Sequence, residues 1–352
     1  MKICYLTGKE LKTKGDGASE DDSESLEHVI PNALGGKLKS RDILSHKANQ
    51  ELNNLIDKEF VKIFESFSLR LGLDKDRPTT PSMRSFHDDY EVDVVFKNDR
   101  YFPRKPFFDP DKKIIYAATT KIGENYKNHL LENGKITKSD CVEIFDDMAG
   151  NIDLKFSLDN KIFKQGFAKI GSAFAAIKGV SRENMKSVID IGAEKFRDKI
   201  LVVPSIPASN RELTFEMKAP TSPLYPVHGL VLSGSKAERL LYCHVELFSA
   251  FQWYVILDDD YDGEDVYYTY ANRLSDGSEI DLSEYLDSVL PEKESALLAT
   301  SYKRISSRKL LEFAREYGKP WVTKYTHFKF NSLAAYSNYV FLRRKAEMLG
   351  LQ

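Results

Sequence analysis

The chain has 352 residues and a formal net charge of −2 at pH 7, which is enough length for two or three domains. Hydrophobic residues make up 42% and aromatic residues 12%, as in a globular protein. No apolar run reaches the length of about 18 residues that a transmembrane helix needs, and the N-terminus lacks the apolar segment of a signal peptide. The three cysteines are far apart and odd in number. We therefore expect a cytoplasmic protein with no membrane association and no disulfide framework.

The first distinctive segment covers residues 27–36 and reads Glu-His-Val-Ile-Pro-Asn-Ala-Leu-Gly-Gly. Residues 26–30 and 41–45 each predict a strand, and apolar residues at spacings of three and four predict an amphipathic helix over 47–67. An acid next to a histidine, a loop, and an amide at a helix start are what a one-metal phosphodiesterase needs. The carboxylate and the amide hold a divalent ion, and the imidazole takes a proton from water.

This segment resembles the HNH endonuclease family over about residues 1–62, most specifically in the run Glu-His-Val-Ile-Pro-x-x-Leu-Gly-Gly. The resemblance implies a small ββα-metal unit in which the histidine ends the first strand and faces the helix N-terminus. It implies His28 as the general base and Glu27 and Asn49 as metal ligands. Asn53 is a candidate third ligand, because some members use two helix residues four apart. These hard oxygen ligands favour one Mg²⁺ or Mn²⁺ per active site.

The chain departs from the family pattern in two places. Many relatives hold a structural zinc with four cysteines, but only Cys4 occupies one of these positions here, so we expect no structural zinc. The middle asparagine of the family motif has no clear match. Ser40 or Asp42 lies in that region, and either side chain is expected to hydrogen-bond the loop backbone and so position it.

We expect four parts in the whole chain: an HNH nuclease domain at 1–67, a linker at 68–89, an α+β recognition or regulatory domain at 90–300, and a basic, aromatic, helical segment at 301–352. The fold class is thus α+β, with a ββα-metal unit, a mainly antiparallel larger domain and a helical C-terminus. Within the larger domain we expect helices at 162–179 and 181–197 and strands at 90–96, 113–119, 151–156, 199–204, 212–217, 226–232, 240–248, 252–257 and 266–270.

Two polar residues of the strand at 240–248, His244 and Glu246, alternate and are expected to face the same side. With His228 on a nearby strand they are a candidate site. The alternative, which we favour, is a half-buried sheet with polar groups on one face.

The C-terminal segment is basic, with eleven Lys and Arg against three Asp and Glu in residues 301–352. Basic and aromatic residues alternate along two expected helices, at 302–317 and 332–349. Such residues contact phosphates and stack on bases, although aromatics in the core and charges in solvent would give the same pattern. The residues expected to bind nucleic acid are Lys303, Arg304, Arg308, Lys309, Arg343, Arg344 and Lys345.

Taken together, these features predict a metal-dependent DNA endonuclease, and the resemblance implies a restriction or phage-defence type. Its expected partner is DNA, with a defence-system protein as a further candidate. A homing-type or mobile-element endonuclease is a second enzymatic possibility. Two other classes stay open: a nucleic-acid or nucleotide sensor whose HNH unit is switched by the second domain, and a non-catalytic DNA-binding protein. The sequence leaves open whether the larger domain recognises a DNA sequence, a modified base, a signalling nucleotide or a protein.

Overall fold

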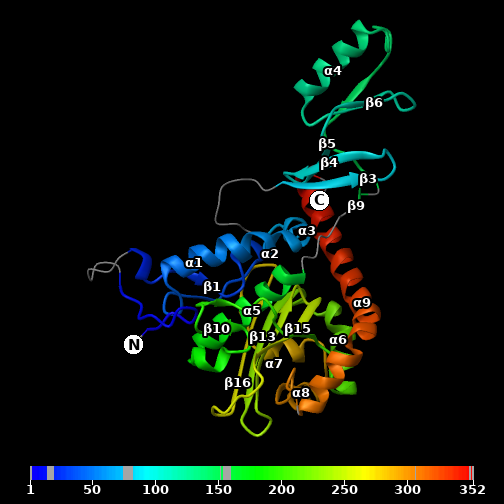
Figure 1. The fold of residues 1–352 in the computed structure, drawn as a ribbon. Coiled ribbons are helices and arrows are strands. Elements are labelled where there is room, and N and C mark those ends of the chain that lie inside the picture. The colour runs from blue at the N-terminus through cyan, green and yellow to red at the C-terminus, as the bar shows by residue number, and fades with distance from the viewer. Residues whose placement is uncertain are drawn as a thin grey trace. The chain divides into compact units, whose positions relative to one another are not determined.

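The computed structural model is an α+β fold with mainly antiparallel sheets and a helical C-terminus, which confirms the predicted fold class (Figure 1). It divides into two compact units, and each is formed by two separate stretches of chain. Unit 1 joins Met1–Asp76 to Leu158–Val340, and unit 2 joins Arg77–Ser157 to Phe341–Gln352. The structure describes residues 2–13, 20–73, 82–150, 152–153, 160–305, 307–348 and 350. Residues 14–25, a stretch rich in Gly, Ser and acidic residues that we expect to form a solvated loop, therefore lie partly outside the described residues.

The centre of unit 1 is a six-stranded antiparallel sheet in the order β12-β15-β14-β13-β16-β17. Alternate side chains of each strand point to opposite faces, so the sheet carries a separate core on each side. The expected strands at 199–204, 226–232, 240–248, 252–257 and 266–270 all belong to it. The bounds are β12 Val202–Pro204, β13 Val227–Ser235, β14 Leu240–Leu247, β15 Phe251–Asp258, β16 Val266–Arg273 and β17 Glu279–Ile280.

Helix α5 (Asn160–Ile177) lies on one face of this sheet and agrees with the helix expected at 162–179. Its small residues permit a close approach, since a Cβ added at Gly171 would lie 3.1 Å from the Cβ of Cys243. The N-terminal helices pack on the outer side of α5, where a Cβ at Gly166 would meet the ring of Phe60. The aromatic core between them includes Phe60, Phe64, Phe67, Phe163 and Phe167.

The other face of the sheet is covered by α6 (Asn210–Lys218), α7 (Leu282–Asp287), α8 (Glu292–Ala299) and the N-terminal part of the long α9 (Arg308–Met348). Helix α6 replaces the strand expected at 212–217, and that prediction is wrong. A reciprocal cap explains the helix: the Ser209 hydroxyl accepts from the Glu212 N–H at 3.1 Å, and the Glu212 carboxylate accepts from the Ala208 N–H at 2.8 Å. Helix α9 is continuous where two helices were expected.

The helix expected at 181–197 is also wrong. The segment forms a single 3₁₀ turn at Arg182–Met185, which Ser181 caps, followed by a short hairpin of β10 (Ile189–Asp190) and β11 (Lys195–Phe196). The carboxylate of Asp190 accepts from the Ala193 N–H at 3.1 Å and closes the hairpin turn. Local turn chemistry therefore outweighs the helical spacing of the apolar residues.

Unit 2 contains a four-stranded sheet in the order β5-β4-β3-β9 and a three-stranded sheet in the order β6-β7-β8, with helix α4 (Thr120–Glu132) and the end of helix α9. Strand β3 lies inside the expected linker at 68–89, so the linker prediction is wrong for residues 83–87. Its Ser85 and His87 side chains are buried, which ties the strand into the unit. The bounds are β3 Met83–His87, β4 Val92–Lys97, β5 Arg100–Pro103, β6 Phe107–Asp109, β7 Ile114–Tyr116, β8 Glu143–Phe145 and β9 Ile152–Asp153.

No described helix combines the length and the hydropathy needed to cross a membrane.

Candidate functional site

The N-terminal motif folds as strand, loop, strand and helix. Strand β1 (Glu27–His28) pairs antiparallel with β2 (Lys39–Ser40), with His28 opposite Lys39. Helix α1 (His46–Leu52) follows, and the Ser45 hydroxyl caps it by accepting from the Ala48 N–H. A π-helical turn (Asn53–Asp57), α2 (Lys58–Ile63) and α3 (Glu65–Arg70) continue α1 along the helix expected at 47–67.

The second strand of this motif lies earlier than expected, at residues 39–40 and not at 41–45. The Ser40 hydroxyl accepts from the Asp42 N–H at 3.0 Å, and this bond bends the chain directly after the strand. Ser45 caps the helix, and its extended backbone forms an isolated β-bridge with Glu24 and not a strand with residues 41–44. Strand β1 is likewise shorter than the predicted 26–30.

The loop between the strands requires its two glycines. A 3₁₀ turn over Asn32–Leu34 ends at Gly35, whose φ of 91° is in the left-handed region that favours glycine. A Cβ at Gly36 would lie 1.9 Å from the carbonyl oxygen of Ile30, so no larger residue fits there. The Leu-Gly-Gly run is therefore a steric requirement of this loop.

Two residues distant in sequence anchor the loop to the main sheet. His228 of β13 contacts the Leu34 carbonyl through Nε2 at 2.8 Å, and Asn272 of β16 donates to the Gly35 carbonyl at 3.2 Å. The His228 Nδ1 accepts from the Phe248 N–H at 3.1 Å, so Nε2 carries the proton and donates. Burial lowers the pKa of His228 to about 4, which keeps this ring neutral.

The sequence assigned the loop-positioning role to Ser40 or Asp42. Ser40 holds its own turn after β2, and the Asp42 carboxylate pairs with the Lys2 ammonium at 2.7 Å. The anchors of residues 34–35 are instead His228 and Asn272. Nothing in the local sequence around the loop signals either residue, because both come from strands about 200 positions away.

The Glu27 carboxylate is 3% exposed and lies 2.8 Å from the ammonium of Lys169 on α5. Lys169 also pairs with Asp57, in the π-helical turn. Burial raises the pKa of Glu27, and Lys169 partly offsets that effect. Burial lowers the pKa of Lys169, but Glu27 and Asp57 outweigh it, and the net shift is upward. The three groups form a buried charge triad.

Asn49, in the first turn of α1, ties this helix to the segment just before β1. Its side-chain nitrogen donates to the Ser25 hydroxyl at 2.9 Å and to the Leu26 carbonyl at 3.2 Å. His28 and Asn53 are both half-buried. The structure thus places Glu27 and His28 on β1 and ties Asn49, on α1, to the segment just before that strand.

The oxygen chemistry of Glu27, Asn49 and Asn53 suits a hard divalent cation. The described residues contain no cluster of three or more His, Cys, Asp and Glu able to hold a metal ion. Glu27 is the one carboxylate among the three predicted ligands, and its Oε1 already pairs with Lys169, which it shares with Asp57. A metal at this position would therefore have to share the Glu27 carboxylate with Lys169 or displace Lys169 from it.

The sequence analysis did not identify Asp57 and Lys169 as residues of this site. A signal for Lys169 exists: it is the single charged residue within the small, apolar stretch from Gly166 to Ala176 of α5. A charge in such a stretch is buried with the helix face and must have a partner.

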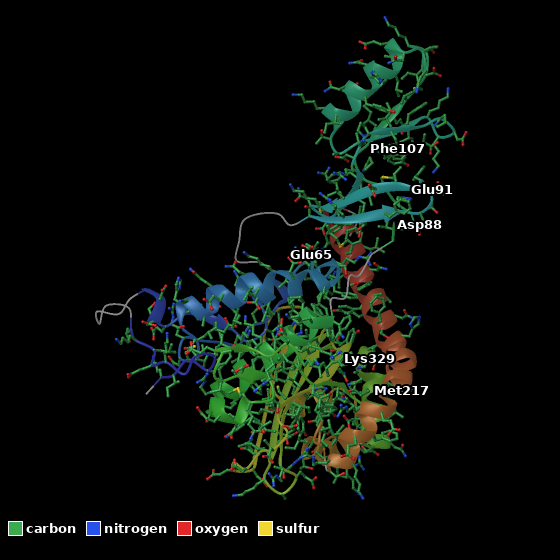
Figure 2. The ribbon with its side chains drawn as sticks, in the orientation of Figure 1. Glu65, Asp88, Glu91, Phe107, Met217 and Lys329 are labelled. Atoms are coloured by element: carbon green, nitrogen blue, oxygen red, sulfur yellow. The ribbon has the colours of Figure 1, made fainter. Side chains whose placement is uncertain are left out.

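A second group of buried charges lies between the other face of the sheet and helices α6 and α9. Glu216 of α6 pairs with Lys303 and with Lys329, and Lys303 also lies 3.0 Å from Glu212. Figure 2 labels Lys329 near Met217, the neighbour of Glu216 on α6. Burial raises the pKa of Glu216, but Lys303 and Lys329 lower it more, and the net pKa lies well below the usual range.

The same cluster corrects two predictions. Lys303 was expected to bind nucleic acid, but it is buried and its charge is used within the fold. His228 was a candidate partner of His244 and Glu246, but it faces the opposite side of the sheet, toward the loop. His244 and Glu246 do share a face, and both are buried, so the favoured interpretation of a half-buried polar face is wrong here.

The other predicted nucleic-acid residues have varied surroundings. Arg344 pairs with Asp99 at 2.6 Å and Lys345 pairs with Asp147, both within unit 2, while Arg343 pairs with Glu347 on α9 at 3.0 Å. In unit 1, Arg308 contacts three backbone carbonyls, Arg304 lies over the ring of Tyr267, and Lys309 is exposed.

No family model, no curated protein and no solved structure matches this chain.

The two loop anchors give a first prediction. Replacing His228 or Asn272 with Ala leaves a buried loop carbonyl without its donor, and we expect each variant to lose about 1–3 kcal/mol of stability. Chemical denaturation measures this change. Asn125→Ala, an exposed helix position in unit 2, is the control and should stay within about 0.5 kcal/mol of wild type. If His228→Ala and Asn272→Ala are as stable as the control, the loop conformation does not depend on these two hydrogen bonds.

Proposed function

We propose that the chain is a metal-dependent endonuclease of the HNH type that hydrolyses phosphodiester bonds in DNA. The supporting observation is the side chain of Asn49, which joins the first turn of α1 to residues 25 and 26, directly before Glu27 and His28. This bond ties the helix that carries Asn49 to the segment directly before Glu27 and His28, within a strand–loop–strand–helix frame. The frame has the order that the HNH resemblance implies.

In this proposal His28 takes the proton from the attacking water. The residue is half-buried at the end of β1, so its ring is held by the strand and is still accessible. Glu27 and Asn49, with Asn53 as a further ligand, would hold one Mg²⁺ or Mn²⁺. When bound, this ion would stabilise the charge that develops on the phosphate and the leaving oxygen. Arg304, Arg308 and Lys309, with Arg343, Arg344 and Lys345, remain candidates for phosphate contacts.

A second candidate is a sensor that controls the nuclease unit from the main sheet. It is supported by the alternation of β13 and β16. His228 and Asn272 anchor the loop on one face, while their neighbours Val227 and Ala271 pack into the core on the other face. A ligand or structural change on the far face of the sheet would act on Val227 and Ala271. It would reach the loop through their direct neighbours in the strands, His228 and Asn272.

The decisive experiment incubates the purified chain with unmodified, methylated and glucosylated DNA in Mg²⁺, in Mn²⁺ and in EDTA. We expect metal-dependent cutting that EDTA abolishes. Cutting of only one class of DNA would identify the recognised feature. Cutting in EDTA would contradict the metal mechanism, and no cutting of any DNA would favour the sensor.

Glu27→Gln tests the metal ligand. The change removes the charge but keeps the shape, and Lys169 retains Asp57 as its partner, so the fold should persist. We expect half-maximal cleavage to need a higher Mn²⁺ concentration, because an amide is a poorer ligand than a carboxylate. Glu24→Gln, which alters a surface pair with Lys2, is the matched control. An unchanged Mn²⁺ requirement in Glu27→Gln would exclude Glu27 as a ligand.

A further inference from the structure

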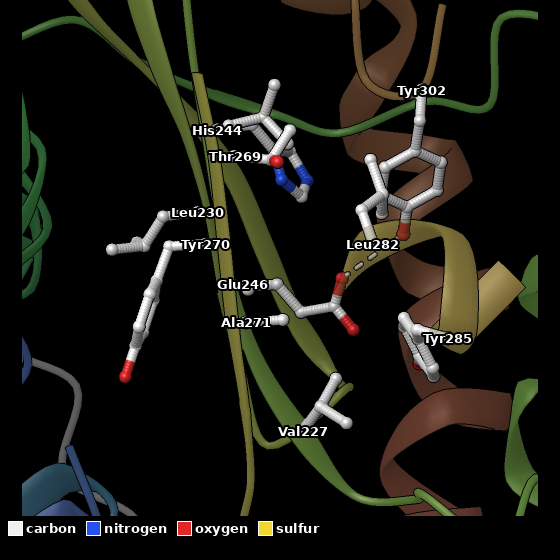
Figure 3. A pocket seen from close by; sticks show the side chains of 12 residues that line it. Val227, Leu230, His244, Glu246, Thr269, Tyr270, Ala271, Leu282, Tyr285 and Tyr302 are labelled. Atoms are coloured by element: carbon white, nitrogen blue, oxygen red, sulfur yellow. Dashed lines mark hydrogen bonds between the residues drawn. The ribbon is translucent and has the colours of Figure 1, made fainter. Parts of the chain in front are cut away.

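A small cavity lies between helix α7 and the six-stranded sheet. It is on the face of the sheet opposite to the one that anchors the loop between β1 and β2. It is lined in part by His244, Glu246, Thr269, Leu282, Tyr285 and Tyr302. In Figure 3, Glu246 and His244 point from the sheet toward Tyr302 and Tyr285, whereas Leu230 and Tyr270 point the other way. The free space is about that of one water-sized group, so the cavity suits an ion or the head of a small molecule.

Two side chains of this cavity have polar atoms without partners. His244 is 1% exposed and Glu246 is 2% exposed, yet both ring nitrogens of His244 and the Oε1 of Glu246 make no hydrogen bond. The other oxygen of Glu246 has a long contact of 3.5 Å with the Tyr302 hydroxyl. A buried polar group without a partner costs about 1–3 kcal/mol, so three such atoms beside one cavity indicate a bound group.

The charges around the cavity do not balance. The cluster holds three carboxylates, Glu212, Glu216 and Glu246, against two ammonium groups, Lys303 and Lys329. The lysines pair with Glu212 and Glu216, and no ion pair neutralises Glu246 among the described residues. Burial, with Glu216 adding to it, raises the pKa of Glu246 to about 7. Near neutral pH, Glu246 therefore takes up either a proton or another cation.

We propose that this cavity binds one small cation of the ammonium type, as the free ion or as the end of a short primary amine. An N–H group can donate to the Glu246 Oε1 and to the neutral His244 ring, and the aromatic rings of Tyr285 and Tyr302 border the same space. The neutral His244 ring offers a nitrogen acceptor, which suits an N–H donor better than an alkali ion. A divalent metal lacks the required cluster of ligands among the described residues.

The proposal predicts a pH dependence with a definite sign. The cation and the proton compete for Glu246, so affinity should rise about tenfold per pH unit up to about pH 7 and level off above it. Burial holds the pKa of His244 well below its usual range, so this ring stays neutral throughout. The other charged or titratable groups that interact with Glu246 are Glu216, Tyr225, Tyr285, Tyr302, Lys303 and Lys329.

The test compares ammonium, methylammonium and potassium chlorides at constant ionic strength and pH 7.5, with thermal unfolding and calorimetry of the full chain. We expect ammonium to raise the melting temperature more than potassium does, and Glu246→Gln to weaken ammonium binding at least about tenfold. Glu279→Gln, at an exposed position of β17, is the control and should respond as wild type.

Binding of methylammonium as well as ammonium would indicate an amine head group, and binding of ammonium alone would indicate the free ion. Either result supports the proposal. Equal effects of potassium and ammonium on the wild type would overturn it, as would an unchanged ammonium response in folded Glu246→Gln. The comparison of salts on the wild type remains decisive if Glu246→Gln does not fold. None of these measurements depends on nuclease activity.

Discussion

His28→Ala is expected to reduce DNA cleavage by about 10²–10⁴-fold, the usual contribution of a general base. The ring is half-buried at the end of a two-residue strand, so the substitution removes little core and the fold should be retained. DNA affinity should also change little, because an imidazole that accepts a proton in the transition state adds little to ground-state binding. Cleavage rates under saturating metal, with circular dichroism and binding measured in parallel, check this result.

His129→Ala is the control for this experiment, because His129 is an exposed histidine on helix α4 of unit 2. The His129→Ala variant should cleave DNA at the wild-type rate. If His28→Ala stays within about tenfold of wild type, below the range expected of a general base, the catalytic assignment fails.

Lys303→Met is expected to destabilise the chain by about 3–5 kcal/mol, the usual cost of removing one partner from a buried ion pair. Lys303 contacts Glu212, Glu216 and the Gln252 side chain, and all of these groups are buried. Without the ammonium, Glu212 has no cation partner among the described residues, while Glu216 keeps Lys329 and the Gln252 amide. Urea denaturation at pH 7 measures the loss.

The difference in the free energy of unfolding between Lys303→Met and the wild type should become smaller as the pH falls from 7 toward 5. A buried carboxylate without its partner has a raised pKa, so its destabilising charge is lost on protonation. Lys293→Met, on the exposed side of α8, is the control and should change stability by less than about 0.5 kcal/mol. Lys303→Met/Glu212→Gln should recover part of the loss. If Lys303→Met is as stable as Lys293→Met, the charged cluster is hydrated and the loss of the Lys303 ammonium has little effect on stability.

Local chemistry sets parts of the N-terminal motif, although the strand predicted at 41–45 did not anticipate the Ser45 cap. Gly36 fits only without a Cβ, and Ser45 caps α1 through one short-range bond, so the loop and the helix start follow from neighbouring residues. The α+β class follows in the same way from alternating strands and from the small, apolar face of α5. These features depend on contacts within a few positions of the chain.

The segments that were assigned wrongly had competing local signals. Residues 212–217 are short enough to read as a strand, and the Ser209–Glu212 cap decides for the helix. Residues 181–197 have helical spacing, but the Asp190 turn produces a hairpin. Apolar periodicity alone does not separate such short elements.

The sequence by itself determined the order of the N-terminal motif, its glycine loop and the α+β class, because each depends on residues close together in the chain. Only the tertiary structure decided the partners of the buried charges. Lys169 reaches Glu27 across 142 positions, Lys303 reaches Glu216 across 87, and His228 reaches Leu34 across 194. A charge in the sequence shows that a partner is needed if it is buried, but the packing of distant helices and strands selects which group is close enough to provide it.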